Sequence, residues 1–126
     1  MTKSAFCQQR VKLKPEAFIE LNEVLTDDFY TDNEFVTHYG MRLFCIDGST
    51  LELPKSEEII RTFGVNNEDN MVPMARISTL YDPLNTIIID GKIEANNCGE
   101  YSLAVMMLGN IKENDLIVMD RGYGAR

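Results

Sequence analysis

The sequence has no apolar run close to the roughly 20 residues that a membrane span requires, and its N-terminus lacks the apolar core of a signal peptide. It has only three cysteines, Cys7, Cys45 and Cys98, and none belongs to a Cys-x-x-Cys pair. Neither a zinc site nor a disulfide framework is therefore indicated. Internal repeats and low-complexity tracts are also missing. These absences favour a cytoplasmic protein of 126 residues, long enough for one domain with a real core.

The sequence also has few basic residues relative to acidic ones. The chain carries 12 Lys and Arg against 20 Asp and Glu, a net charge of −8 at pH 7. This balance argues against a nucleic-acid-binding module, which usually presents a basic face. The excess acid is nevertheless compatible with a DNA enzyme in two ways. A site that binds a divalent metal through carboxylates concentrates acid, and the basic surface of a large DNA enzyme can lie in other parts of that enzyme.

The first third of the chain has helical patterns. Ser4 is a candidate N-cap for a short helix over 4–13, and Pro15 suits the first turn of a second helix over about 15–30. The apolar face of this second helix is formed by Phe18, Leu21, Leu25 and Phe29. We expect a helical segment over residues 1–40, followed by an α/β domain over 41–126.

The α/β part alternates short apolar runs with turn signals. A strand ending at Asp47-Gly48 is followed by a short apolar stretch, which is a second strand after a turn or a continuation of the first after a kink. The polar stretch 54–71 indicates a long loop with about one helical turn. The expected elements are strands at 41–46, 50–53, 72–81, 86–93 and 116–119, a tight turn at 82–85, and a helix at 99–109.

The order of these elements predicts a mixed sheet. The strands on either side of the turn at 82–85 should form an antiparallel hairpin. The helix at 99–109 can act as a right-handed crossover that returns the last strand parallel to the first. We therefore expect the spatial strand order 3-2-1-4, in which only the last pair is parallel.

Two aspartates would then lie near each other. Asp47 follows the first strand and Asp120 follows the last, and ligand sites in open α/β sheets form at such carboxyl ends. Two carboxylates within about 4–7 Å would repel each other unless a hard cation such as Mg²⁺ lay between them. The alternative stays open that Asp47-Gly48 is only a turn and Asp120 only a helix cap or a solvated strand end.

Several motifs resemble insertion-sequence transposases of the IS-four group, which are DDE enzymes. The stretch from Ile46 to Thr50 resembles the family's first-aspartate motif, and the Asp-Arg-Gly-Tyr run at 120–123 resembles its second. Residues 72–82 resemble the family's second strand, 99–100 its helix start and 13–18 its preceding helix. The resemblance covers nearly the whole chain and implies a ribonuclease-H-like fold, here truncated.

The resemblance implies that Asp47 and Asp120 are catalytic metal ligands. Asp47 would bridge two Mg²⁺ or Mn²⁺ ions and Asp120 would bind one of them, for attack on a DNA phosphodiester. The family's third ligand, a glutamate in a Tyr-Arg-Glu-Lys type of motif, has no counterpart here. We expect a fragment of a transposase catalytic domain that is inactive alone. The alternative is a non-catalytic remnant that acts as an interaction or structural protein.

The expected partner is DNA at transposon ends, with no membrane. Arg76, Arg121 and Tyr123 are the candidate DNA contacts, the last two because of the resemblance. For each there is a plainer alternative: an ion pair of Arg76 with Asp90 or Glu94 across the hairpin, an ion pair of Arg121 with a nearby acid, and packing of Tyr123 on the sheet. Glu100 could lie near the metal site, but a place in the first turn of a helix also explains it. An exposed edge of a truncated sheet could support self-association.

Overall fold

The computed structural model describes residues 2–32, 34–66 and 71–123. The chain forms two compact units, Met1–Phe35 and Val36–Arg126. Within the described residues, no helix is both long enough and apolar enough to cross a membrane. The expected boundary between residues 40 and 41 stays a prediction.

The first unit consists of α1 (Lys3–Arg10) and α2 (Glu16–Asp32). The hydroxyl of Thr2 accepts a hydrogen bond from the Ala5 N–H at 3.3 Å, so Thr2, and not the expected Ser4, is the N-cap of α1. The apolar face predicted for α2 is present but largely exposed: the accessible fractions are 62% for Phe18 and 66% for Leu21.

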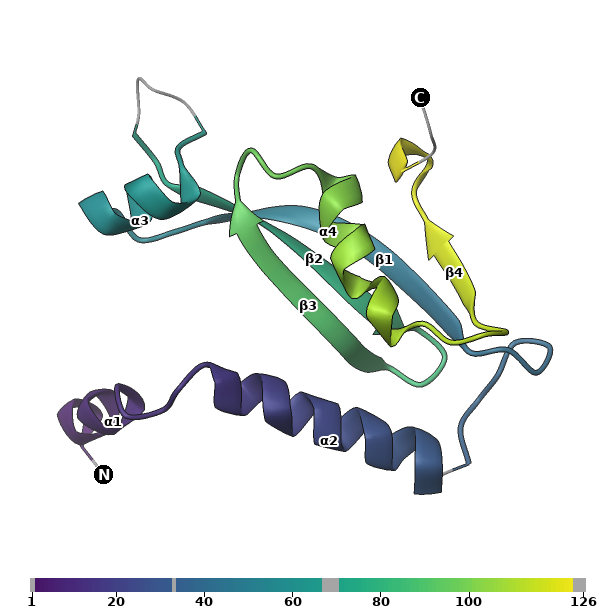
Figure 1. Cartoon of the computed structure of the whole chain (residues 1–126). Coiled ribbons are helices and arrows are strands. Elements are labelled where there is room, and N and C mark those ends of the chain that lie inside the picture. Colours follow the sequence, from purple (N-terminus) through teal and green to yellow (C-terminus); the bar gives the residue numbers. More distant parts are fainter. Residues whose placement is uncertain (1, 33, 67–70, 124–126) are drawn as a thin grey trace. The chain divides into compact units, whose positions relative to one another are not determined.

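The second unit is built on a four-stranded sheet (Figure 1). Its strands are β1 (Leu43–Glu52), β2 (Met74–Asp82), β3 (Ile87–Ala95) and β4 (Leu116–Met119). They lie in the order β3-β2-β1-β4; β1 is antiparallel to β2 and parallel to β4, and β2 is antiparallel to β3. This confirms the predicted order 3-2-1-4 and places β3 and β4 at the edges of this sheet.

The first strand is one uninterrupted strand of 10 residues. The interpretation of Asp47-Gly48 as a turn is therefore wrong. The reason is that β2 pairs with β1 far beyond this point, from Cys45 opposite Tyr81 to Glu52 opposite Met74. The second strand supplies regular ladder partners to the Asp-Gly backbone, and tertiary pairing overrides the local turn preference.

The turn between β2 and β3 is organised by a buried carboxylate. Asp82 is 0% exposed, and its Oδ1 accepts hydrogen bonds from the backbone N–H groups of Leu84 and Asn85 at 2.9 and 3.0 Å. The Asn85 side-chain amide donates to Asp82 Oδ2 at 2.7 Å. This is the tight turn that Asp favours, because its side chain bonds to backbone groups two and three residues further on.

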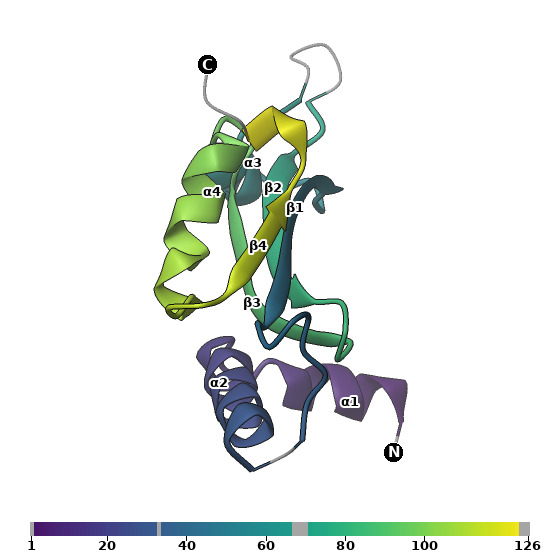
Figure 2. The same ribbon diagram turned by 90° about the vertical axis from the view of Figure 1, so that its right-hand side faces the viewer.

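The crossover between β3 and β4 is made by α4 (Glu100–Met107) and the short 3₁₀ turn η1 (Leu108–Asn110). Figure 2 shows α4 lying against one face of the sheet. The buried core comprises Leu103, Ala104 and Met107 of α4 with Phe44, Ile46, Leu80, Ala75 and Ile89 of the strands. The helical pattern also predicts Tyr101 and Leu108 on the buried face, but they are 68% and 41% exposed.

The polar stretch before β2 contains a helix, α3 (Glu57–Phe63), which is longer than the single turn expected. The Ser56 hydroxyl accepts a hydrogen bond from the Ile59 N–H at 3.2 Å and caps its first turn. Gly64 ends the helix with a φ of 82°, a conformation that glycine adopts without steric cost.

Truncation of Met107 tests the packing of α4 on the sheet. Met107 is 0% exposed, and we expect Met107→Ala to lower the free energy of unfolding by about 2–5 kcal/mol, because the cavity cannot fully close. The adjacent Met106 is 50% exposed, so Met106→Ala is the matched control and should cost under about 1 kcal/mol. Urea unfolding followed by NMR signals of the sheet measures both changes. Equal effects of the two variants would contradict this packing.

Candidate active site

The two aspartates follow the parallel strand pair. The pairing of β1 with β4 runs from Leu43 opposite Leu116 to Ile46 opposite Met119. The next residue is Asp47 on one chain segment and Asp120 on the other. The structure therefore brings the two aspartates to the same level of the sheet, on neighbouring chain segments. Asp47 lies in the middle of β1, however, and only Asp120 follows a strand end. The predicted carboxylate separation of about 4–7 Å stays a prediction.

An ion pair at the other end of the parallel pair sets this register. Arg42 Nε donates to Asp115 Oδ1 at 2.8 Å, and Arg42 Nη2 donates to Asp115 Oδ2. The two side chains are only 13% and 4% exposed. Arg42 and Asp115 each directly precede a strand and have the same sequence separation as Asp47 and Asp120, 73 residues. The ion pair therefore holds the register in which the two aspartates are neighbours.

Both carboxylates are exposed and partly used by the local backbone. Asp47 Oδ1 accepts a hydrogen bond from the Gly48 N–H at 2.9 Å, and Asp120 Oδ1 accepts one from the Arg121 N–H. Oxygen donors of this type suit Mg²⁺ or Mn²⁺. Two carboxylates are an incomplete ligand set, however, and the described residues contain no group of three or more His, Cys, Asp or Glu that could hold a metal ion.

The backbone beside Asp47 is covered by side chains from two other segments. A Cβ atom placed on Gly48 would lie 3.1 Å from Tyr123 Oη and 3.4 Å from Glu100 Cγ. Tyr123 belongs to the 3₁₀ turn η2 (Arg121–Tyr123), and Glu100 is the first residue of α4. Figures 1 and 2 both show η2 beside the N-terminal end of α4. Ser78 is buried and lies opposite Gly48 on the neighbouring strand β2. Its hydroxyl donates a hydrogen bond to the Asp47 carbonyl oxygen at 3.1 Å.

The Tyr123 hydroxyl lies among these carboxylates. Its oxygen is buried and makes no hydrogen bond of normal geometry within the described residues. Burial raises the pKa of the Tyr123 hydroxyl; the nearby Ser78 hydroxyl lowers it, and the negative charges of Glu100, Asp47 and Asp120 raise it further. Burial outweighs the opposing effect of Ser78, so the hydroxyl stays neutral at physiological pH.

The partner of Arg76 differs from the predicted alternatives. Glu94 is opposite Arg76 in the register of β2 and β3, as expected, but the ion pair goes to Glu100, whose Oε1 lies 2.8 Å from Arg76 Nη1. Asp90 instead pairs with Lys92 at 2.9 Å. The reason is that α4 begins over this part of the sheet, a tertiary contact that cross-strand reasoning does not include.

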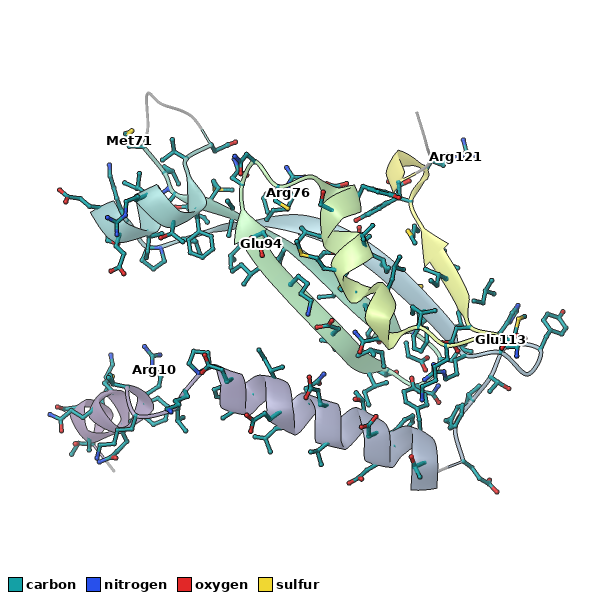
Figure 3. The ribbon with its side chains drawn as sticks, in the orientation of Figure 1. Arg10, Met71, Arg76, Glu94, Glu113 and Arg121 are labelled. Carbon is teal, nitrogen blue, oxygen red and sulfur yellow. The ribbon has the colours of Figure 1, made fainter. Side chains whose placement is uncertain are left out.

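Arg121 is exposed, and within the described residues no ion pair involves it. Figure 3 shows Arg76 near the start of α4 and Arg121 beyond the end of β4. The two arginines thus lie on different segments around the aspartates. Of these two, only Arg121 presents a guanidinium group that is not already held by a carboxylate in the described structure.

The comparison with known sequence families adds to this geometry. Residues 38–126 match the transposase DDE domain. The chain belongs to this family. Searches of curated proteins and of solved structures found no match. The sheet order and the α/β arrangement agree with the ribonuclease-H-like fold of DDE transposases, as expected from the sequence.

Family membership supports a transposase-related function, and transposases of this family act on DNA. DDE transposases generally use divalent metal ions, and the paired aspartates have the donor chemistry for them.

Sequence reasoning missed two parts of this site: the Arg42–Asp115 pair and the contact of Tyr123 with Gly48. The Arg42–Asp115 pair could have been found from the sequence, because its 73-residue separation equals that of Asp47 and Asp120.

Proposed function

We propose that this chain is the first part of the catalytic domain of a DDE transposase of the IS-four group, with Asp47 and Asp120 as two of its catalytic metal ligands. The observation that carries the proposal is the placement of these aspartates directly after the paired residues Ile46 and Met119. The motifs around both aspartates and the match over residues 38–126 support it.

Two divalent ions, Mg²⁺ or Mn²⁺, would supply an activated nucleophile and would stabilise the leaving oxygen of a DNA phosphodiester. In this scheme Asp47 and Asp120 hold the ions through their carboxylate oxygens. The described residues offer no group of three metal-ligating side chains, so this scheme needs at least one ligand in addition to these two aspartates. The proposed cellular location is the cytoplasm.

Among the three candidate DNA contacts, Arg121 is the strongest. Arg121 is exposed and lies directly after Asp120 in the sequence, two residues before Tyr123. In contrast, the guanidinium group of Arg76 is engaged by Glu100, and the Tyr123 hydroxyl is buried. Arginine binds phosphate through paired N–H groups. We propose that Arg121 contacts a DNA phosphate near the metal ligands and that Arg76 contributes less.

A non-catalytic role is the second candidate. The net charge of −8 and the lack of a three-ligand group in the described residues both favour a protein that keeps the fold without DNA chemistry. The edge strands β3 and β4 could then pair with another copy of the chain. Size-exclusion chromatography with light scattering would test this: a monomer at high concentration would exclude the edge pairing.

Titration with Mn²⁺ tests the proposed metal site. We expect the folded chain to bind Mn²⁺ weakly, and we expect Asp47→Asn and Asp120→Asn each to abolish that binding, because either change leaves one charged ligand. Electron paramagnetic resonance of free Mn²⁺ measures the binding. Glu94→Gln, which removes an exposed acid on β3, is the matched control and should bind as the wild type does. Equal binding by wild type and both aspartate variants would show that the site is not formed.

A further inference from the structure

Tyr123 connects η2 to β1 at the proposed site. The Asp120–Tyr123 segment turns back on itself, and the Tyr123 N–H donates to the Asp120 carbonyl oxygen at 3.0 Å. The hydroxyl end of Tyr123 then reaches the backbone of β1 at Gly48, the residue after Asp47. A single side chain thus joins the segment of one proposed ligand to the strand of the other.

Glycine at position 48 makes this contact possible. A Cβ atom there would approach Tyr123 Oη to 3.1 Å, closer than ordinary van der Waals contact, and Glu100 Cγ to 3.4 Å. Glu100 cannot move away without weakening its 2.8 Å ion pair with Arg76. The surface over Gly48 is therefore closed on one side by α4, and Tyr123 fits the remaining space.

We propose that Tyr123 is a positioning residue, which packs over Gly48 and against Glu100 and thereby holds Asp120 beside Asp47. The side chain acts through its fit to the backbone of β1, where its hydroxyl oxygen lies 3.1 Å from the position of a Cβ atom on Gly48. The inference deepens the proposed function, since the position of Asp120 matters there as that of a metal ligand. A direct contact of the Tyr123 hydroxyl with DNA is the competing role.

The test uses complementary changes on the two sides of the contact. Gly48→Ala adds a methyl group 3.1 Å from Tyr123 Oη, and Tyr123→Phe removes that oxygen. We expect Gly48→Ala to speed hydrogen exchange of the Arg121 and Tyr123 amides by roughly tenfold or more, as forced overpacking displaces η2. The double variant should restore exchange to within about twofold of the Tyr123→Phe variant alone, because the added methyl group then has room.

Gly91→Ala is the matched control. Gly91 also lies within the sheet, but among the described residues a Cβ atom there would meet only the Ser78 carbonyl oxygen, at an ordinary 3.9 Å. Exchange of the η2 amides should not change in this variant. Unchanged η2 amides in Gly48→Ala, or a double variant as perturbed as Gly48→Ala, would overturn the proposal.

Mn²⁺ affinity provides the second measurement and separates the two proposals. If Tyr123 positions Asp120, Gly48→Ala should weaken Mn²⁺ binding and the double variant should recover it. If the wild type binds no Mn²⁺ but the amides respond as expected, the proposed metal site fails and the positioning contact stands. A third outcome is that Tyr123→Phe lowers DNA affinity while Gly48→Ala leaves hydrogen exchange of the η2 amides unchanged. That result would assign the hydroxyl to DNA contact and refute the positioning role.

Discussion

Asp115→Ala is expected to lower the free energy of unfolding of the sheet by about 3–5 kcal/mol, the usual cost of leaving one member of a buried ion pair without its partner. Asp115 binds two nitrogens of Arg42 and also accepts the Lys112 N–H at 2.7 Å, so the change removes three hydrogen bonds. The Arg42 guanidinium, which also lies 4.9 Å from the centre of the Phe44 ring, would keep its charge in a mostly buried place.

The measurement is urea unfolding followed by NMR signals of β1 and β4, which exclude any contribution from α1 and α2. Lys92→Ala is the matched control, since its partner Asp90 is on the same sheet but Lys92 is 36% exposed, and its loss should cost under about 1 kcal/mol. Replacing both members of the buried pair, as in Arg42→Met with Asp115→Leu, should recover much of the loss. A loss in Asp115→Ala no larger than that in Lys92→Ala would mean that the pair does not hold the two strands.

This pair also links stability to the proposed chemistry. Besides the ion pair, the Leu116 N–H donates to the Arg42 carbonyl oxygen at 2.9 Å, which begins the parallel ladder. The fourth strand has only four residues, so few ladder hydrogen bonds oppose a shift of its register. A shift by one residue would move every side chain of β4 to the other face. Mn²⁺ binding should therefore fall in Asp115→Ala even under conditions where the sheet stays folded.

The second expected result is that the 126-residue chain does not cleave DNA. Two-metal phosphodiester chemistry requires ions held about 3.5–4 Å apart by a full set of ligands. Within the described residues, no three metal-ligating side chains form such a group, and Glu100, which lies beside Gly48, is ion-paired with Arg76. The chain should therefore show neither nicking nor strand transfer on a labelled duplex in Mg²⁺ or Mn²⁺ at low salt.

The control for this assay is Asp47→Asn, which should be indistinguishable from the wild type. Cleavage by the wild type that disappears in Asp47→Asn would refute the expectation and show that another acid completes the ligand set. Glu100→Gln would then identify that acid. If the activity survives in Asp47→Asn, it comes from a contaminating nuclease.

Weak DNA affinity is expected for the same chain. Affinity for DNA comes largely from neutralising phosphates, and here 20 acidic residues oppose 12 basic ones. Arg121→Ala should reduce what binding there is more than Arg76→Ala does, because Glu100 already neutralises Arg76. A larger loss in Arg76→Ala would show that DNA displaces Glu100 from this arginine.

Local sequence signals, together with a general rule of chain topology, were sufficient to predict the order of the strands in the sheet. The Asp-Pro-Leu-Asn turn predicts the hairpin because the Asp82 carboxylate accepts the backbone N–H groups of Leu84 and Asn85 within the same four residues. The apolar pattern of α4 and the handedness of crossovers then place β4 beside β1. These features depend on neighbours in the sequence or on a general rule of chain topology, so one sequence reveals them.

The tertiary structure alone decided how the Asp47-Gly48 backbone continues and which carboxylate pairs with Arg76. Asp47-Gly48 has the composition of a turn but continues as a strand, because β2 supplies backbone partners on the far side. Cross-strand reasoning predicts that Arg76 pairs across the hairpin, but it pairs with Glu100, which packing of α4 brings over the sheet. The sequence by itself identified the two aspartate motifs, at residues 46–50 and 120–123. The predicted pairing of the first and last strands also made Asp47 and Asp120 neighbours. Only the folded sheet decided that Tyr123 covers Gly48, because this contact joins segments far apart in the chain, and local preferences do not reach across that distance.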